Sequence, residues 1–526
     1  MPLRSRTTYL TMLALVAYLG VTSAGAQAPP PPPPPLPPVP VPAENPITEP
    51  KRVLGKILFW EEQLSSDHTV ACGTCHAPTF SGTDPRPAVN PGLDQIFGTP
   101  DDDQGSLGII RSDSSNHYFA DPVFGLNPQV GTRSAPAVIG SQWSGLLFWD
   151  GRAGPSFVDP LTGATAIAQG GALEQQSVAP PVNDVEMAHE MRDWNEIVAN
   201  LATAKPLALA RNLPSDVSAA IAAHPTYPAL FASAFGDSAI TATRVAFAIA
   251  TYERTLVPNQ TPWDAFNAGN RNALTPNQQS GLQAFANTTC TVCHRPPLFA
   301  DGTFRNIGLR PVEEDRGRQG VTGNAADRGK FKVPTLRNAG LKTEHMHTGG
   351  LRSMQQVVDF YLHANGQVQF ADNQDPLVQQ IQVPPNLVPA LVDFLQNGLT
   401  DPRVAAGQAP FDRPTLGASP NQCSNGIDDD GDGLIDEADP GCASSGDTSE
   451  HSVDLTCDDG LDNDGDGLVD LADPDCTSPT ATEAGANPPP VGCSSIGGLG
   501  YAVAPLPFLR LRRRKDGSRR SAQPSR

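Results

Sequence analysis

The chain has 526 residues, of which 39% are hydrophobic, and its formal net charge is −20. The charge is unevenly spread, because residues 421–484 hold 19 Asp and Glu and neither Lys nor Arg, which leaves −1 for the rest of the chain. A nearly neutral body with an acidic tail excludes a protein that binds nucleic acid through a broad basic surface. The length allows several domains, and 54 prolines and 48 glycines indicate long loops and linkers.

The N-terminus has the pattern of an export signal. A basic segment, MPLRSRTTY, precedes the apolar LTMLALVAYLGV and then Ala24-Gly25-Ala26, which fits a signal-peptidase site. We therefore predict a signal peptide over residues 1–26 and an exported protein, in the periplasm or at the cell surface. A retained anchor is the less favoured alternative. Residues 27–47 are rich in proline and predict a stiff, polyproline-type spacer.

Two C-x-x-C-H pentads follow, at residues 72–76 and 290–294. This pattern is typical of covalent c-type haem attachment, in which each thiol adds to a vinyl group and the histidine ligates iron. A zinc site is one alternative, but neither a second C-x-x-C nor an H-x3-H pattern lies nearby. A thioredoxin-like pair is another, but it would follow a strand, and the local pattern is helical. The predicted haem-binding residues are Cys72, Cys75, His76, Cys290, Cys293 and His294.

Helical patterns precede both pentads. Before the first pentad, apolar residues recur at helical spacing: Val53, Leu54, Ile57 and Leu58. Before the second, Thr275 is placed as an N-cap, Pro276 as the first helical residue and Gln278 as the partner in a capping box. No run of alternating residues predicts a large sheet. We predict a mainly α fold with two tandem cytochrome c-like haem domains, over residues 48–260 and 261–402.

Several phrases around the pentads resemble those of the bacterial di-haem cytochrome c peroxidase and MauG family, over roughly residues 48–400. They are LGKILFWEEQLSSD, TRSAPAVIG, FWDGRAG, NDVEMAHE, YERTL and FKVPTLRNAGLKTEHMHTGG. The resemblance implies two all-α domains, two covalent haems and a calcium ion between them. It also implies a peroxidatic N-terminal domain and an electron-transfer C-terminal domain, acting on hydrogen peroxide or on a protein substrate.

The resemblance gives two residues a part in catalysis. Glu186 matches the glutamate of the family's N-P-x-E-M-like phrase, so we expect it to move a proton between the two peroxide oxygens at the haem on His76. Trp149 matches the tryptophan that lies between the haems and would carry electron exchange. Without the resemblance, Glu186 reads as a solvated residue and Trp149 as a core aromatic. Asp150 and Arg152 are expected to form a structural pair or to contact haem propionates.

The resemblance also predicts how each iron is ligated. Leu126 stands where gated family members carry a capping histidine, so we expect the iron on His76 to be five-coordinate. His117 is the alternative ligand, although its polar segment is more typical of the surface. Tyr361 stands where MauG carries a tyrosine, and is expected to be the second ligand of the iron on His294. Competing ligands on or near this apolar helix face are Met354, Met346 and His363.

The calcium ion between the haems would take its donors from residues that differ from the family pattern. Ser134 stands where the family has asparagine, and the backbone carbonyls would come from Lys342 and Glu344. Thr288 replaces the tryptophan that MauG carries two residues before its second pentad. The MauG route for long-range protein oxidation therefore lacks one of its residues here.

After a predicted linker over residues 403–420, residues 421–478 contain two copies of an Asp-rich segment, CSNGIDDDGDGLIDEADPGC and CDDGLDNDGDGLVDLADPDC. Their acidic residues fall at the ligand positions of EF-hand-like calcium loops, with Asp in place of Glu at the last position, which predicts weak binding. An acidic disordered tail is the alternative. The predicted disulfides are Cys423–Cys442 and Cys457–Cys476. The predicted calcium ligands are Asp428, Asp430, Asp432, Asp436, Asp439, Asp462, Asp464, Asp466, Asp470 and Asp473.

Residues 479–526 form a low-complexity tail. Its phrase GCSSIGGLGYAVAPLPFLRLRRRK resembles a degraded sorting signal of the MYXO-CTERM type, which would be processed at Cys493 and anchor the protein at the surface. A simple basic tail is the alternative.

Together these features predict an exported di-haem c-type cytochrome peroxidase that reduces hydrogen peroxide to water. Electrons would come from a small cytochrome c or cupredoxin, enter at the haem on His294 and pass near Trp149 to the haem on His76. A MauG-like di-haem oxidase acting on a partner protein and a non-catalytic di-haem electron carrier remain as alternatives. A homodimer also stays open, and no nucleic acid is expected as a partner.

Overall fold

The computed structural model describes residues 33–417 except 87, 116 and 126, and, in the tail, residues 434, 438–442, 452, 455–458, 471 and 474–482. These residues belong to two units, one reaching to residue 450 and one beginning at residue 451. The predicted signal peptide, Leu126, Cys423, Cys493 and the sorting segment lie outside the described residues, as do nine of the ten predicted calcium ligands of the tail.

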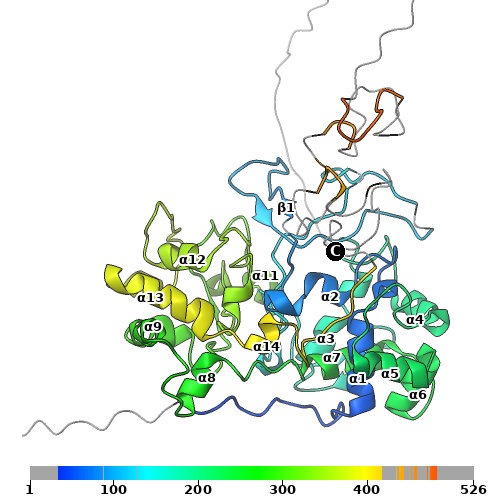
Figure 1. Cartoon of the computed structure of the whole chain (residues 1–526), viewed down its shortest axis with the longest axis horizontal. Helices are drawn as coiled ribbons and strands as arrows, with labels where there is room; N and C mark the ends of the chain where they lie inside the picture. Colours follow the sequence, from blue (N-terminus) through cyan, green and yellow to red (C-terminus); the bar gives the residue numbers. More distant parts are fainter. Residues whose placement is uncertain are drawn as a thin grey trace, which may run out of the picture. The chain divides into compact units, whose positions relative to one another are not determined.

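The first unit is mainly helical, as predicted (Figure 1). Its first half contains α1 (Glu49–Phe59), α2 (Cys72–Cys75), α3 (Ala172–Ser177), α4 (Trp194–Thr203), α5 (Ser215–Ala223), α6 (Tyr227–Phe235) and α7 (Ala242–Glu253). Its second half contains α8 (Pro262–Asn267), α9 (Pro276–Ala286), α10 (Cys290–Cys293), α11 (Gln319–Thr322), α12 (Met354–Tyr361), α13 (Val388–Asp393), the π-helical turn η9 (Phe394–Gly398) and α14 (Pro402–Ala405).

The strands of the described residues are short and form three separate antiparallel pairs. They are β1 (Val89–Asn90) with β2 (Asp103–Gln104), β3 (Phe157–Val158) with β4 (Thr165–Ile167), and β5 (Phe304–Arg305) with β6 (Phe331–Lys332). The prediction that no large sheet is present is therefore confirmed for this part of the chain.

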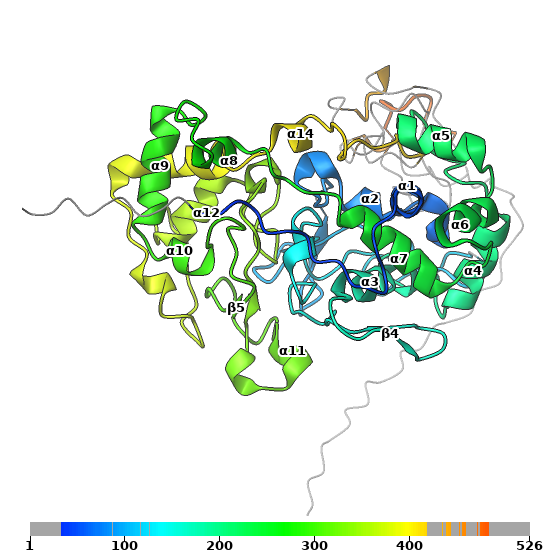
Figure 2. The same ribbon diagram turned by 90° about the horizontal axis from the view of Figure 1, so that it is seen from below.

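The first half packs around α1 and α7, which lie side by side (Figures 1 and 2). Their contact is closest at Gly55, where an added Cβ would lie 1.9 Å from the carbonyl oxygen of Ala248. Only a residue without a side chain lets the two helix backbones approach this closely. The core around this contact contains residues from Val53 to Leu256 and, further along the chain, Val404, Phe411 and Leu416. The helix α1 forms where the sequence predicts a helix.

The second half repeats this arrangement around α9 and α13 (Figure 1). An added Cβ at Gly281 would lie 1.9 Å from the carbonyl oxygen of Ala390. The helix α9 begins at Pro276 with Thr275 as its N-cap and a capping box to Gln278, which confirms that prediction. Each pentad thus follows a helix that is held against a partner helix through a glycine, and the second core runs from Trp263 to Leu399.

Two segments that the sequence predicts as connectors pack against the body. In the proline-rich segment, the carbonyl of Pro37 accepts a hydrogen bond from Trp143 (3.1 Å) and that of Pro40 accepts one from Arg254 (3.2 Å). In the predicted linker over residues 403–420, Phe411 and Leu416 are buried in the first core. The linker prediction is therefore wrong as far as residue 417, because these apolar side chains return to the first half.

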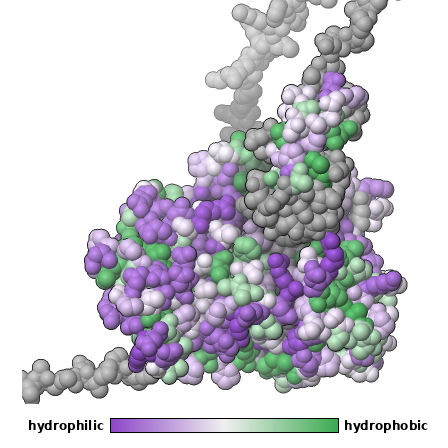
Figure 3. All heavy atoms as spheres, in the orientation of Figure 1, coloured by the Kyte–Doolittle hydropathy of each residue, from purple (hydrophilic) through white to green (hydrophobic). Residues whose placement is uncertain are grey.

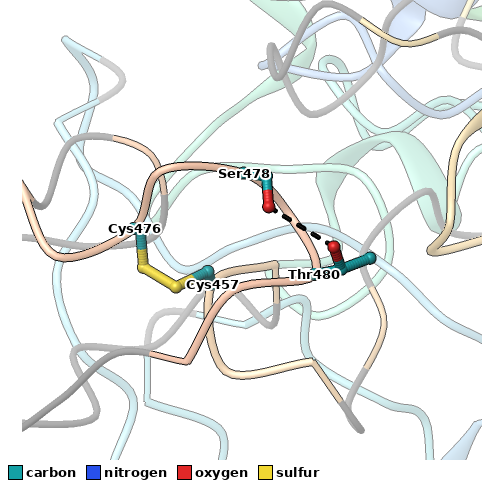
Figure 4. The surroundings of a disulfide bond; sticks show 4 residues. All are labelled: Cys457, Cys476, Ser478 and Thr480. Atoms are coloured by element: carbon teal, nitrogen blue, oxygen red, sulfur yellow. Dashed lines mark hydrogen bonds between the residues drawn. A yellow bond between two sulfur atoms is a disulfide. The ribbon is translucent and has the colours of Figure 1, made fainter.

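The second unit contains the disulfide Cys457–Cys476, as predicted, with its Cα atoms 5.4 Å apart (Figure 4). In the first unit, Cys442 is also disulfide-bonded. Asp439 is the predicted tail ligand that the structure describes, and its carboxylate accepts a hydrogen bond from the backbone N–H of Gly441 (2.6 Å). Calcium binding by the tail stays a prediction.

The surface in Figure 3 mixes hydrophilic and hydrophobic side chains over both groups of helices. Among the described helices, none combines the length and the apolar character needed to cross a bilayer.

Candidate functional site

Each pentad lies on the wall of a large cavity. The first cavity is lined by Cys72, Cys75 and His76. The second is lined by Cys290, Cys293 and His294. Apolar side chains make up most of the rest of both linings, which suits a flat, largely apolar ligand such as a porphyrin.

The two pentad histidines are held in the same tautomer. Nδ1 of His76 lies 3.1 Å from the carbonyl oxygen of Gly82, and Nδ1 of His294 lies 3.0 Å from that of Phe299. A carbonyl oxygen only accepts, so Nδ1 carries the proton and Nε2 keeps its lone pair. Burial lowers the pKa of both imidazoles, which keeps them neutral. A neutral imidazole oriented through Nδ1–H is the form that ligates a metal.

The four pentad cysteines are not disulfide-bonded to one another. They lie on the single helical turns α2 and α10, where residues three apart share one face. Burial raises the pKa of all four thiols. Two unpaired thiols, a neutral histidine and an apolar cavity fit a covalently attached haem. No strand directly precedes either turn, unlike in the thioredoxin alternative.

The two pentads differ in their exposure. Gly73 is buried against Trp60, since an added Cβ would lie 2.2 Å from the indole ring. At the second pentad, Val292 is 40% exposed and no residue of α10 is buried. The attachment side of the second cavity therefore reaches the surface, whereas that of the first is covered by protein.

The carboxyl group of Glu186 lines the first cavity. Its residue lies in a turn, where the side chain of Asn183 accepts its backbone N–H (3.0 Å). The backbone of this turn packs closely against Gly108, where an added Cβ would lie 1.8 Å from the carbonyl oxygen of Val185. Burial raises the pKa of Glu186, and the cation Arg152 opposes this shift. The structure thus directs Glu186 into the cavity that holds His76, and not into solvent.

Trp149 lines both cavities. Its indole N–H donates to the carbonyl oxygen of Ser134 (2.8 Å), and its own carbonyl accepts from the backbone N–H of Lys332 (2.8 Å). The ring meets His347 edge-on, with 6.3 Å between centroids. The buried aromatic side chain of Trp149 is therefore shared by the walls of the two sites.

Asp150 pairs with Arg152 (3.0 Å) and with Arg133 (2.7 Å), which confirms the predicted structural pair. Both guanidinium groups line the first cavity. Lys332 lines both cavities and Lys342 the second, and burial lowers the pKa of each ammonium to about 8. Such cations suit the carboxylates of haem propionates.

The residue predicted as the second ligand of the iron on His294 lies on the wall of the second cavity. Tyr361, the last residue of α12, lines the second cavity, and burial raises the pKa of its phenol. Met346 and Met354 line the same cavity, whereas His363 is exposed and does not. His345 also lines it, which sequence reasoning missed.

Around the first cavity, the alternative ligand His117 is excluded by its position. Its side chain is 80% exposed and lies 3.4 Å from Asp113, as expected of a surface residue. Met187 and Glu253 line the first cavity and were missed by sequence reasoning, because neither belongs to a recognised metal-binding spacing.

The residues predicted to hold calcium between the haems make other contacts. The hydroxyl of Ser134 donates to the carbonyl oxygen of Met346 (2.7 Å), and the carboxylate of Glu344 pairs with Arg352 (2.5 Å). The side chain of Lys342 points to the second cavity. Across the described residues, no group of three or more His, Cys, Asp or Glu side chains is arranged to hold a metal ion.

The chain is similar to known di-haem proteins. Residues 49–272 match the family model of di-haem cytochrome c peroxidases. A methylamine utilization protein MauG from Methylophilus methylotrophus is 28% identical over 324 residues, which cover 61% of this chain and 74% of that protein. A cytochrome c551 peroxidase from Nitrosomonas europaea is 28% identical over 358 residues, or 67% and 84% of the two chains.

Among solved structures, a MauG-like protein associated with microbial copper homeostasis aligns with a TM-score of 0.50 and 24% identity, over 72% of this chain and 96% of that chain. This likeness concerns the fold alone.

Proposed function

Because this chain belongs to the di-haem cytochrome c peroxidase and MauG family, we propose that it is an exported peroxidase that reduces hydrogen peroxide to water. The family implies an oxidoreductase with two c-type haems. The observation that carries the proposal is that Glu186 and the pentad of His76 line one cavity.

The residues of the first cavity fit a division of labour. A haem attached through Cys72 and Cys75 supplies, when bound, the iron at which peroxide is reduced. Glu186 accepts the proton of the inner peroxide oxygen and returns it to the outer one, so that the outer oxygen leaves as water. Over the whole reaction, which includes the release of this first water, two electrons and two protons convert one peroxide to two water molecules. The raised pKa of Glu186 makes its carboxylate a better base than an exposed one.

The second cavity fits the entry of electrons. The exposure of Val292 supports docking of a small cytochrome c or cupredoxin beside the second pentad. Trp149, which lines both cavities, offers an aromatic relay between them. Tyr361 is proposed as the second ligand of the iron on His294, with Met346 and Met354 as its rivals.

Four further parts of the proposal come from the sequence. They are the two tandem haem domains, export by the N-terminal signal, a calcium ion near Ser134, Lys342 and Glu344, and calcium binding with surface anchoring by the tail.

A MauG-like oxidation of a partner protein is the second candidate. Tyr361 on the second cavity favours it, since MauG carries a tyrosine there. A pure electron carrier would have no use for a buried carboxyl such as Glu186 in the haem cavity.

The test is peroxide turnover by the holoprotein with a reduced small cytochrome as donor. Replacement of Glu186 by Gln should lower kcat/KM about 10²- to 10⁴-fold. Glu190→Gln is the matched control, because Glu190 lies in the same phrase but its side chain is 40% exposed and pairs with Arg111. Unchanged turnover in Glu186→Gln would remove Glu186 from the mechanism. No turnover in the wild type would favour the other two candidates.

A further inference from the structure

Glu253 is a buried carboxyl group of the first cavity that the proposed peroxide chemistry does not use. It is the last residue of α7, is 3% exposed and lines the cavity together with Cys72 and Glu186. Its Oε2 atom is buried and has no hydrogen-bond partner. A carboxylate in such a place is costly, so the group tends to keep a proton.

The neighbouring cation is bound elsewhere. Arg254 forms two hydrogen bonds to the carboxylate of Glu174 on α3 (2.7 and 2.9 Å). Asn45 donates a further hydrogen bond to Glu174 (2.8 Å), and Lys51 of α1 donates to Asn45 (2.8 Å). This network satisfies the charges of α3 and leaves Glu253 without a counter-ion.

The other charged groups around α7 are also paired. On α1, Arg52 and Lys56 both bind Asp216. On the cavity side, Arg133 and Arg152 both bind Asp150. The other ionisable groups that line the cavity with Glu253 include the ammonium of Lys332, the carboxyl of Glu186 and the thiol of Cys72. Burial raises the pKa of Glu253 to about 8, and the opposing effect of Arg254 is the smaller one.

We propose that Glu253 is the proton-accepting group of the first haem cavity, which takes up one proton from solvent when the haem on His76 gains one electron. The charge balance is simple: one electron arrives, one carboxylate becomes a carboxylic acid, and the buried site keeps its net charge. Positive charge at the iron favours the carboxylate, and its loss on reduction favours the acid. Glu253 then holds a proton close to the place where peroxide reduction consumes protons.

The experiment is a spectroelectrochemical titration of the holoprotein without peroxide, from pH 5 to 9. The midpoint potential of the haem on His76 should fall, over part of this range, by about 59 mV for each tenfold fall in proton concentration. In Glu253→Gln, which keeps the shape of the side chain, this slope should flatten. In Glu186→Gln it should persist, because this variant leaves Glu253 unchanged and because the carboxyl group of Glu186, unlike that of Glu253, has the cation Arg152 beside it in the cavity.

An unchanged slope in Glu253→Gln, or its loss only in Glu186→Gln, would overturn the proposal. If Glu253→Gln does not fold, proton uptake is measured on the wild type with an indicator dye during photoreduction. About one proton per electron at the first haem is then expected, and none would overturn the proposal. Because no peroxide is present, failure here is separate from failure of the peroxidase assignment.

Discussion

Replacement of Gly55 or Gly281 by alanine should weaken the helix pair that precedes each pentad. At both positions the new Cβ would lie 1.9 Å from a carbonyl oxygen of the facing helix, Ala248 or Ala390. Real Cβ atoms essentially never approach within 3.0 Å, so the helices would have to separate by about 1 Å. Overpacking of this kind costs about 1–3 kcal/mol, and the partner atom here is rigid backbone, which favours the upper end.

Alanine also gains about 1 kcal/mol over glycine inside a helix, so the net loss should be about 2 kcal/mol. For a domain of about 150–250 residues, a loss of 1 kcal/mol lowers Tm by about 2–4 °C, so a loss of about 2 kcal/mol corresponds to a fall in Tm of roughly 4–8 °C. The assay is thermal unfolding of the holoprotein followed by circular dichroism. Gly320→Ala is the matched control, because Gly320 is helical, lies in α11 and has nothing within 4 Å of an added Cβ. A Tm for Gly55→Ala equal to or above the wild-type value would refute the packing argument.

Three further predictions concern the two cavities. Since burial raises the pKa of Glu186, the acid limb of the kcat/KM profile should lie above the range of an ordinary glutamate, and a profile without that limb would count against Glu186 as the base. Tyr361→Met should change the optical and EPR signals of the second haem and raise its potential, whereas unchanged spectra would mean that Tyr361 does not ligate the iron. Burial raises the pKa of Glu344 from 4.5 to about 7. Between about pH 4.5 and 7 the folded state therefore binds more protons than the unfolded state, so the ionisation of Glu344 lowers the free energy of unfolding as the pH rises through this range. Glu344→Gln should therefore raise Tm more at pH 8 than at pH 5, and an equal effect at both values would contradict this reasoning.

The sequence was most informative where a function needs a fixed spacing. The pentads, the capping box from Thr275 to Gln278 and the disulfide Cys457–Cys476 depend on residues close in the chain, and all could be read from it. The position of Glu186 in the first cavity needed the family resemblance, since its spacing alone predicts a solvated residue.

What the sequence could not show depends on contacts between distant segments. Phe411 and Leu416 lie among prolines and polar residues, so their return to the first core is not visible from local composition. Lys332 lines both cavities. Its position depends on the hydrogen bond that its backbone N–H, in β6, donates to the carbonyl oxygen of the distant Trp149. Glu253 belongs to the phrase YERTL, in which a cation, Arg254, directly follows it. The Oε2 atom of Glu253 is nevertheless buried without a hydrogen-bond partner, because Arg254 is bound by Glu174, 80 residues away from it along the chain.

The central claim is that two haems are bound on one chain, the one on His76 with an open coordination position and the one on His294 with both axial positions filled. Resting-state EPR of the purified holoprotein, quantified per chain, tests this most directly. We expect one high-spin and one low-spin ferric haem in equal amounts. Two low-spin haems, or a protein without a haem signal, would contradict it.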